Sequence, residues 1–155
     1  MKNAKEIKLS KGKVALVNKE DLLEVSQYNW CVSGDERYAV SRTKGKYVLL
    51  HRLILKPNKN QTVDHINGNG LDCRRENLRL CTQQENTRNQ RLSAANTSGY
   101  KGVSFHKSRG KWRAYVKING VQKHLGLYSS PREAAKAYNK AALELFKQFA
   151  KLNKI

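Results

Sequence analysis

The sequence contains no apolar run that approaches the length of a membrane span, and no charged-then-apolar stretch of the kind that begins a secretory signal. We therefore expect a soluble, cytoplasmic protein with no membrane partner. Its three cysteines, Cys31, Cys73 and Cys81, form no CxxC pair. Structural zinc sites normally use closely spaced pairs, so free thiols are expected. A zinc site built from Cys73, Cys81 and a histidine is the less favoured alternative.

Acidic side chains are scarce: 12 Asp and Glu stand against 31 Lys and Arg in 155 residues, and the formal net charge is +19. This excess is larger than solubility requires, and it indicates a polyanionic partner, either nucleic acid or an anionic membrane surface, of which we favour nucleic acid. The imbalance is greatest from Asn96 onward, where thirteen basic residues stand against two acidic ones. The C-terminal third is therefore expected to make the main electrostatic contact with phosphates.

Residues 6–50 alternate short apolar stretches with turns, which predicts strands. Lys44-Gly45-Lys46 is expected to form the turn of a hairpin. The favoured interpretation is a sheet that supports the next part of the chain, and extra nucleic-acid contact through its lysines is the alternative. We expect His51 to be packed or hydrogen-bonded rather than to bind a metal.

The most informative pattern is Asp64-His65, followed by Asn77 and Asn86. A carboxylate beside an imidazole, with amides at fixed distances, can both hold a hard cation and activate a water molecule. Each residue taken singly is more often an ordinary surface polar group or a turn former. Together, in so basic a chain, they favour a site that hydrolyses phosphodiesters.

The elements around this pattern can be predicted from local signals. Thr62–Ile66 is expected to form a strand, a turn follows at residues 67–70, and residues 77–81 can return as a second strand. Thr82 and Glu85 fit a capping box, so a helix should run from there to about Leu92. A strand-strand-helix unit of this kind brings residue 64 near residue 86.

This unit resembles the ββα-metal (His-Me finger) fold of HNH nucleases, and more narrowly the phage and intron-encoded homing type. The resemblance implies that Asp64 and Asn86 bind one divalent metal ion, Mg²⁺ by preference and Mn²⁺ as the alternative. It also implies that His65 is the general base and that Asn77 braces the loop that orients His65. The last position of the family motif is often histidine, and this chain has Asn86 there.

The resemblance implies a metal-dependent endonuclease that hydrolyses double-stranded DNA and leaves 5′-phosphate and 3′-hydroxyl ends. One metal ion and one base act on one strand, so a monomer is expected to nick, and a double-strand break would need dimerisation or two events. The expected state is a monomer or weak dimer. The alternative is a non-catalytic DNA-binding regulator that keeps a degenerate nuclease fold. A structural RNA-binding protein is a third option, which the lack of exposed aromatic stacking motifs weakens.

The C-terminal part predicts a three-stranded antiparallel sheet followed by one helix. Strands are expected within residues 98–105, within 110–118 and at 121–128, with Asn119-Gly120 as a two-residue hairpin turn. Alternation places Trp112, Ala114, Val116 and Ile118 on the core face of the middle strand. A helix should begin after Ser130 and run to about Phe149, with an apolar stripe that includes Ala134, Tyr138, Ala141, Ala142 and Leu145.

The segments YKGV, GKW, LGLY and EAAKAY between Gly99 and Asn153 resemble the Apetala-type, ethylene-response-factor DNA-binding domain of plants. That family lays its sheet in the major groove of DNA. Several arginines of the family are replaced here, so the plant target sequence does not carry over. The resemblance, with Arg113 added by alternation, implies DNA contacts from Lys101, Ser104, His106, Lys111, Arg113, Tyr115, Lys117, Gln122 and His124.

The expected fold is therefore α+β in four segments. Residues 1–50 form a supporting or DNA-contacting segment, and 51–92 form the HNH nuclease unit. Residues 93–98, which are small and polar, form a linker, and 99–155 form the DNA-binding domain.

Overall fold

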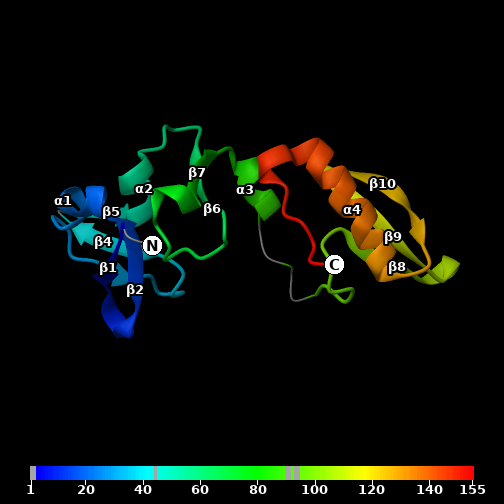
Figure 1. Cartoon of the computed structure of the whole chain (residues 1–155), viewed down its shortest axis with the longest axis horizontal. Helices are drawn as coiled ribbons and strands as arrows, with labels where there is room; N and C mark the ends of the chain where they lie inside the picture. The colour runs from blue at the N-terminus through cyan, green and yellow to red at the C-terminus, as the bar shows by residue number, and fades with distance from the viewer. Residues whose placement is uncertain (1–2, 44, 90–91, 93–94) are drawn as a thin grey trace. The chain divides into compact units, whose positions relative to one another are not determined.

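A computed structural model of the chain describes residues 3–43, 45–89, 92 and 95–155. Short strands and a few helices make a mixed α and β architecture (Figure 1). The chain divides into two compact units, Met1–Asn86 and Thr87–Ile155. Within the described ranges, every helix is too short or too polar to cross a bilayer. The four-segment division expected from the sequence stays a proposal, and residues 93 and 94 of the expected linker lie outside the described residues.

The first unit contains small antiparallel sheets. Strand β1 pairs with β2, β4 lies between β3 and β5, and β6 pairs with β7. The predicted hairpin between β4 and β5 is confirmed, although Lys44 in its turn lies outside the described residues. The strands are β1 Ala4–Lys8, β2 Val14–Asn18, β3 Cys31–Val32, β4 Ala39–Thr43, β5 Lys46–Leu49, β6 Thr62–His65 and β7 Leu78–Cys81. The helices are α1 Leu22–Val25, α2 Leu50–Leu55 and α3 Gln83–Asn89, with 3₁₀ turns η1 Ser10–Gly12, η2 Lys19–Asp21 and η3 Arg75–Asn77.

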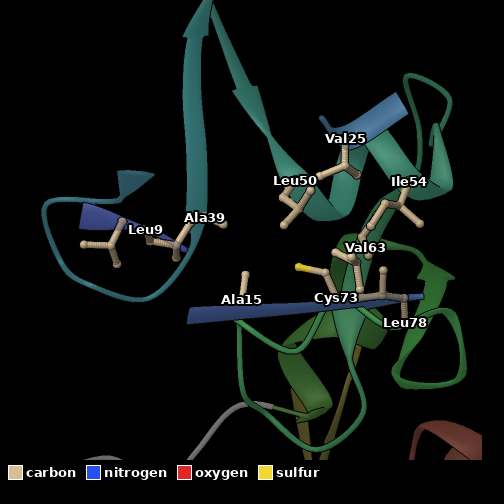
Figure 2. Packing of buried hydrophobic residues seen from close by; sticks show 11 residues of the cluster. Leu9, Ala15, Val25, Ala39, Leu50, Ile54, Val63, Cys73 and Leu78 are labelled. Atoms are coloured by element: carbon tan, nitrogen blue, oxygen red, sulfur yellow. The ribbon is translucent and has the colours of Figure 1, made fainter. Parts of the chain in front are cut away.

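The core of the first unit lies between these elements (Figure 2). Val25 of α1 and Leu50 and Ile54 of α2 point toward Val63 of β6 and Leu78 of β7. All five side chains are buried. Burying such an aliphatic side chain stabilises the fold by about 1.5–3 kcal/mol. The two strands of the HNH pattern are therefore anchored to the helix that precedes them.

The N-terminal strands also hold the loop between β6 and β7. Leu16 of β2 donates its amide hydrogen to the carbonyl of Leu71 (2.9 Å), and Cys73 donates to the carbonyl of Leu16 (2.8 Å). The side chain of Asn18 accepts a hydrogen bond from the backbone N–H of Arg75 at 2.6 Å. Strand β2 therefore fixes the position of the loop between β6 and β7.

The second unit is a three-stranded antiparallel sheet in the order β10-β9-β8, with helix α4 along one face (Figure 1). Ser130 caps α4 as predicted, because Glu133 N–H donates to its hydroxyl oxygen at 3.2 Å and Glu133 Oε2 accepts from Ser130 N–H at 3.3 Å. The elements are β8 Val103–His106, β9 Lys111–Ile118, β10 Val121–Tyr128, α4 Pro131–Phe146, and 3₁₀ turns η4 Lys107–Arg109 and η5 Lys147–Phe149. The α-helix ends before the expected Phe149, because Lys147 adopts a positive φ of 48°.

The core of the second unit lies between α4 and the sheet. Ala114 and Val116 are buried, as the alternation of β9 predicts. The expected apolar stripe of α4 is wrong at Leu145, which is 41% exposed, whereas Phe146 is 6% exposed. Positions 134, 138, 142 and 146 are spaced by four, so Phe146 rather than Leu145 continues the buried face.

Candidate active site and DNA interface

Asn77 holds both ends of the loop that follows β6. Its backbone carbonyl accepts from Ile66 N–H at 2.9 Å, and its side-chain oxygen accepts from Asn67 N–H at 3.0 Å. Its side-chain amide donates to the carbonyl of Asp72 at 2.7 Å. Asn77 is 6% exposed. Buried hydrogen bonds of this kind fix backbone positions, because leaving any of these groups unpaired costs about 1–3 kcal/mol. Asn77 therefore fixes the loop between β6 and β7, and its role in orienting His65 stays a prediction.

Further polar contacts fix the same loop. Arg74 donates to both oxygens of Asp72 at 2.7 Å each, and Asn67 donates to Asp72 Oδ2 at 2.9 Å. The hydrogen bond from Arg74 holds the pKa of Asp72 below its usual value. Gly70 lies so close to the segment between β3 and β4 that an added Cβ would come within 2.1 Å of the carbonyl oxygen of Arg37. The loop is therefore held by charge, by amides and by a close backbone contact.

Asp64 is buried beside a positive charge. It is paired with Arg79 across β6 and β7. Arg79 donates to Asp64 Oδ2 through Nε at 2.8 Å and through Nη2 at 2.6 Å. The side chains of Asp64 and Arg79 are 4% and 17% exposed. Arg79 was missed by sequence reasoning, although the register of the two predicted strands places it opposite Asp64.

His65, the last residue of β6, packs against aromatic rings. The ring of His51 lies edge-on to it, with centroids 4.9 Å apart, and the ring of Tyr38 lies at 5.9 Å. The sulfur of Cys73 is 3.9 Å from Nε2 of His65. Burial lowers the pKa of His65, and the carboxylates of Asp64 and Asp72 partly oppose that shift. The neutral imidazole, which can accept a proton, is thus the favoured form near pH 7.

Asp64 and His65 leave β6 on different sides, since successive side chains of a strand point to opposite faces. Asp64 meets Arg79 on one side, and His65 meets His51 of α2 on the other. His51 is buried, as predicted. The pair therefore occupies two neighbouring environments at the end of one strand, one charged and one aromatic.

Asn86 lies in the first turn of α3, where its N–H donates to the carbonyl of Thr82 at 3.0 Å. The predicted capping box is present: Glu85 Oε2 accepts from Thr82 N–H at 2.8 Å, and Glu85 N–H donates to the Thr82 hydroxyl at 3.3 Å. The order strand, strand, helix agrees with the sequence. The described part of α3 ends at Asn89, and residues 90 and 91 of the expected continuation lie outside the described residues.

The donors available to a metal ion are oxygen atoms. Cys31, Cys73 and Cys81 are free thiols, as expected. Burial raises the pKa of Cys73 to about 12 and that of Cys81 to about 11, which disfavours the thiolates that zinc requires. In the described ranges, no group of three or more His, Cys, Asp or Glu side chains is suited to hold a metal. The side chains of Asp64 and Asn86 carry oxygen atoms, the type of ligand that a hard cation prefers.

Strand pairing places eight of the nine predicted DNA-binding residues on one face of the second sheet. Residues directly opposite each other on paired strands share a face. The face opposite the helix therefore carries Ser104 and His106 from β8, Lys111, Arg113, Tyr115 and Lys117 from β9, and Gln122 and His124 from β10.

Arg113 lies at the centre of this face. Its Nη2 donates to the hydroxyl of Ser104 at 3.3 Å, its guanidinium lies 5.4 Å from the ring centre of Tyr115, and its Nε is buried without a hydrogen-bond partner. A hollow of about 430 Å³ beside it is lined by His106, Arg109, Arg113, Gln122, His124 and Leu127. Arg109 and Leu127 were not predicted. The pairing of β9 with β10 could have identified Leu127, because Leu127 lies opposite Arg113 after a bulge in β10.

Lys101 differs from the other eight predicted residues. It precedes β8, its Nζ donates to the carbonyl of Arg88, and its N–H donates to the side chain of Asn153 at 2.7 Å. Burial lowers the pKa of Lys101. Its side chain thus makes contacts within the second unit, and a DNA contact from Lys101 would have to replace the bond to Arg88.

Two protein-family models match the chain: the HNH endonuclease model over residues 48–88 and the AP2 domain model over residues 98–148. No solved structure matches it. Among plant proteins, APETALA2-like protein 2 of Oryza sativa subsp. indica is 35% identical over 48 residues, which are 31% of this chain and 11% of that protein.

One phage protein matches part of the chain, and one viral protein matches nearly all of it. Protein 3.8 of Escherichia phage T7 is 44% identical over 64 residues, which are 41% of this chain and 53% of that protein. An uncharacterized HNH endonuclease of Acanthamoeba polyphaga mimivirus is 36% identical over 151 residues, which are 94% of this chain and 77% of that protein. Both resemblances inferred from the sequence are thereby confirmed: the chain belongs to the HNH endonuclease family and carries an AP2 domain in its C-terminal part.

Proposed function

We propose that this protein is a metal-dependent endodeoxyribonuclease that nicks double-stranded DNA at preferred sites, as a homing enzyme does. The observation that carries the proposal is the consecutive pair Asp64 and His65 at the end of β6, beside a loop that Asn77 fixes through three hydrogen bonds. Burial of charged and titratable groups is costly, and clusters of such groups are common at functional sites. In an HNH family member, phosphodiester hydrolysis is the chemistry that this arrangement suits best.

We propose that β6, β7 and α3 form the ββα-metal unit. Asp64 lies on β6 opposite β7, and Asn86 lies in the first turn of the helix that follows β7. These two residues would hold one divalent cation, Mg²⁺ by preference, through oxygen atoms. When bound, the cation would supply positive charge to the phosphate and to the departing 3′ oxygen.

The general base in this proposal is His65. Its imidazole is held neutral by burial, which lowers its pKa, so it can take a proton from the attacking water. For both groups to act on one phosphate, the phosphate would have to bind at the end of β6, where Asp64 and His65 lie on opposite faces of the strand. Hydrolysis would leave 5′-phosphate and 3′-hydroxyl ends, and one such site in a monomer would cut one strand.

The AP2 sheet selects the DNA in this proposal. Its basic face presents lysine, arginine, histidine and tyrosine side chains from three strands, with α4 on the opposite side. Such a face suits the phosphates and base edges of a major groove. The hollow beside Arg113 is lined mainly by polar and charged side chains, and we propose that it binds an acceptor on DNA.

The test is a nicking assay on supercoiled plasmid with the full chain and Mg²⁺. Conversion to open circles, inhibited by EDTA and absent in the His65→Ala variant, would support the proposal. The His65→Ala variant should still bind DNA within about twofold, because it lies outside the AP2 sheet. A protein that shifts DNA in gels but leaves plasmid intact with Mg²⁺ and with Mn²⁺ would instead be the non-catalytic regulator.

A further inference from the structure

The carboxylate that the proposed function assigns to the cation is already engaged in an ion pair. Arg79 places two nitrogens on a single oxygen, Oδ2 of Asp64, at 2.8 and 2.6 Å. The two residues are direct partners across β6 and β7, so the pairing of the strands holds the contact in place. Both side chains are largely buried, and solvent therefore screens the pair weakly.

This ion pair opposes cation binding in the absence of DNA. The charge of the carboxylate is compensated by the guanidinium, and an incoming divalent ion would meet the positive charge of Arg79 within a few ångströms of its ligand. Two charge-assisted bonds to Oδ2 also compete directly with the metal for that oxygen. An isolated carboxylate at the same place would attract the cation more strongly.

A DNA phosphate would change this balance in two ways. Its oxygens match the planar fork of a guanidinium, so they offer Arg79 an alternative acceptor. The same phosphate can also supply an oxygen ligand and negative charge to the cation. Transfer of the hydrogen bonds of Arg79 from Asp64 to the phosphate would release Oδ2 for the metal ion.

From these contacts we infer that Arg79 is a positioning residue that couples cation binding to DNA binding, an inference that rests on the proposed function. The protein without DNA holds the cation weakly, and the protein on DNA holds it tightly. Coupling between two ligands is reciprocal, so the cation must strengthen DNA binding by the same factor. Such coupling restricts the loaded site to protein that is already on its substrate.

The experiment measures the binding of Mn²⁺ by electron paramagnetic resonance in the full chain carrying His65→Ala, which keeps the DNA intact. Titrations are made with and without a saturating duplex, and a titration of the duplex without protein is subtracted. We expect the duplex to tighten Mn²⁺ binding at least tenfold. In the added Arg79→Gln variant, Mn²⁺ binding without DNA should tighten at least threefold, and the effect of DNA should fall below threefold. Arg79→Lys, which keeps the charge but loses the fork, should lie between the two.

Two outcomes separate the coupling from the site itself. If Asp64→Asn in the same background leaves Mn²⁺ binding unchanged, then the metal assignment within the proposed function is wrong. If Asp64→Asn removes Mn²⁺ binding but Arg79→Gln leaves the DNA-free affinity unchanged or weaker, then the coupling is wrong. Thermal unfolding of each variant reports whether it is folded. Should Arg79→Gln not fold, equal Mn²⁺ affinity with and without the duplex in the His65→Ala protein overturns the inference.

Discussion

The rings of His51 and His65 lie edge to face, with centroids 4.9 Å apart and planes 83° apart. His51 comes from α2 and His65 from the end of β6, so this contact joins the helix to the proposed base. The Nδ1 atom of His51 is buried without a hydrogen-bond partner. Two imidazoles this close and this buried are stable together only while both are neutral.

The first prediction concerns acid stability. Burial lowers the pKa of His51 to about 3, whereas an unfolded histidine titrates near 6.5. Between these two pH values, His51 is protonated in the unfolded state and neutral in the native state. Stability should therefore fall as the pH drops below about 6.5, by up to about 1.4 kcal/mol per pH unit for this one group.

Urea denaturation of the wild type and of His51→Phe between pH 7 and pH 4 measures this effect. The variant keeps a ring against His65 and removes the titrating group, so its stability curve should be flatter on the acid side. The matched control is His124→Phe, because His124 is exposed on β10. Identical acid slopes for wild type and His51→Phe would contradict the prediction.

The second prediction concerns the brace at Asn77. Asn77→Ala would remove the partners of Asn67 N–H and the Asp72 carbonyl, and should destabilise the first unit by about 2–4 kcal/mol. At temperatures where the variant is still folded, nicking should fall at least tenfold while DNA binding persists. Asn60→Ala, in an exposed loop, is the control and should change stability by less than about 0.5 kcal/mol. If Asn77→Ala nicked DNA at the wild-type rate, then the position of this loop would not matter for cleavage.

The third prediction concerns the basic face of the AP2 sheet. Replacing Lys111, Arg113 and Lys117 by glutamine should reduce the salt dependence of DNA binding by about 0.9 in log–log slope for each phosphate that the variant no longer neutralises. The matched triple is Arg132, Lys136 and Lys140, which are exposed on α4, away from that face. The two triple variants remove the same number of positive charges. Binding is measured in EDTA so that the DNA is not cut. If the α4 triple lowered the slope as much, then the docking face would be misassigned.

The fourth prediction concerns Gly102. Its φ of 71° is unfavourable for other residues, and an added Cβ would lie 2.1 Å from the ring of Tyr138 and 2.5 Å from the carbonyl oxygen of Tyr115. Gly102→Ala should therefore destabilise the second unit by more than about 2 kcal/mol, through strain and a displaced helix. Gly110→Ala is the control, because Gly110 also has a positive φ but open space around it, and it should cost only about 1 kcal/mol. Denaturation followed by Trp112 fluorescence, in a Trp30→Phe background, measures both.

The parts of the molecule that sequence reasoning predicted well are those specified by local signals. The capping boxes at Thr82 and Ser130 lie where predicted, and alternation along β9 identified the basic face. Contacts that depend on distant pairing were missed. The contact of Arg79 with Asp64 becomes visible only when β6 and β7 are paired in register. The hydrogen bond from Lys101 to the carbonyl of Arg88 likewise joins residues that are far apart in the sequence. The prediction that Leu145 is buried was wrong by one position, since Phe146 is the buried residue. The sequence does not show how α4 is rotated toward the sheet.

The pairing of Leu16 with the loop around Asp72 affects any attempt to express the HNH region as a separate fragment. The region matched by the HNH endonuclease model begins at residue 48, so the strand that pins this loop comes from outside it. A fragment cut at that boundary would lose the backbone partners of Leu71 and Cys73 and the amide of Asn18. A fragment that is meant to keep this loop in place would therefore have to include the hairpin of β1 and β2.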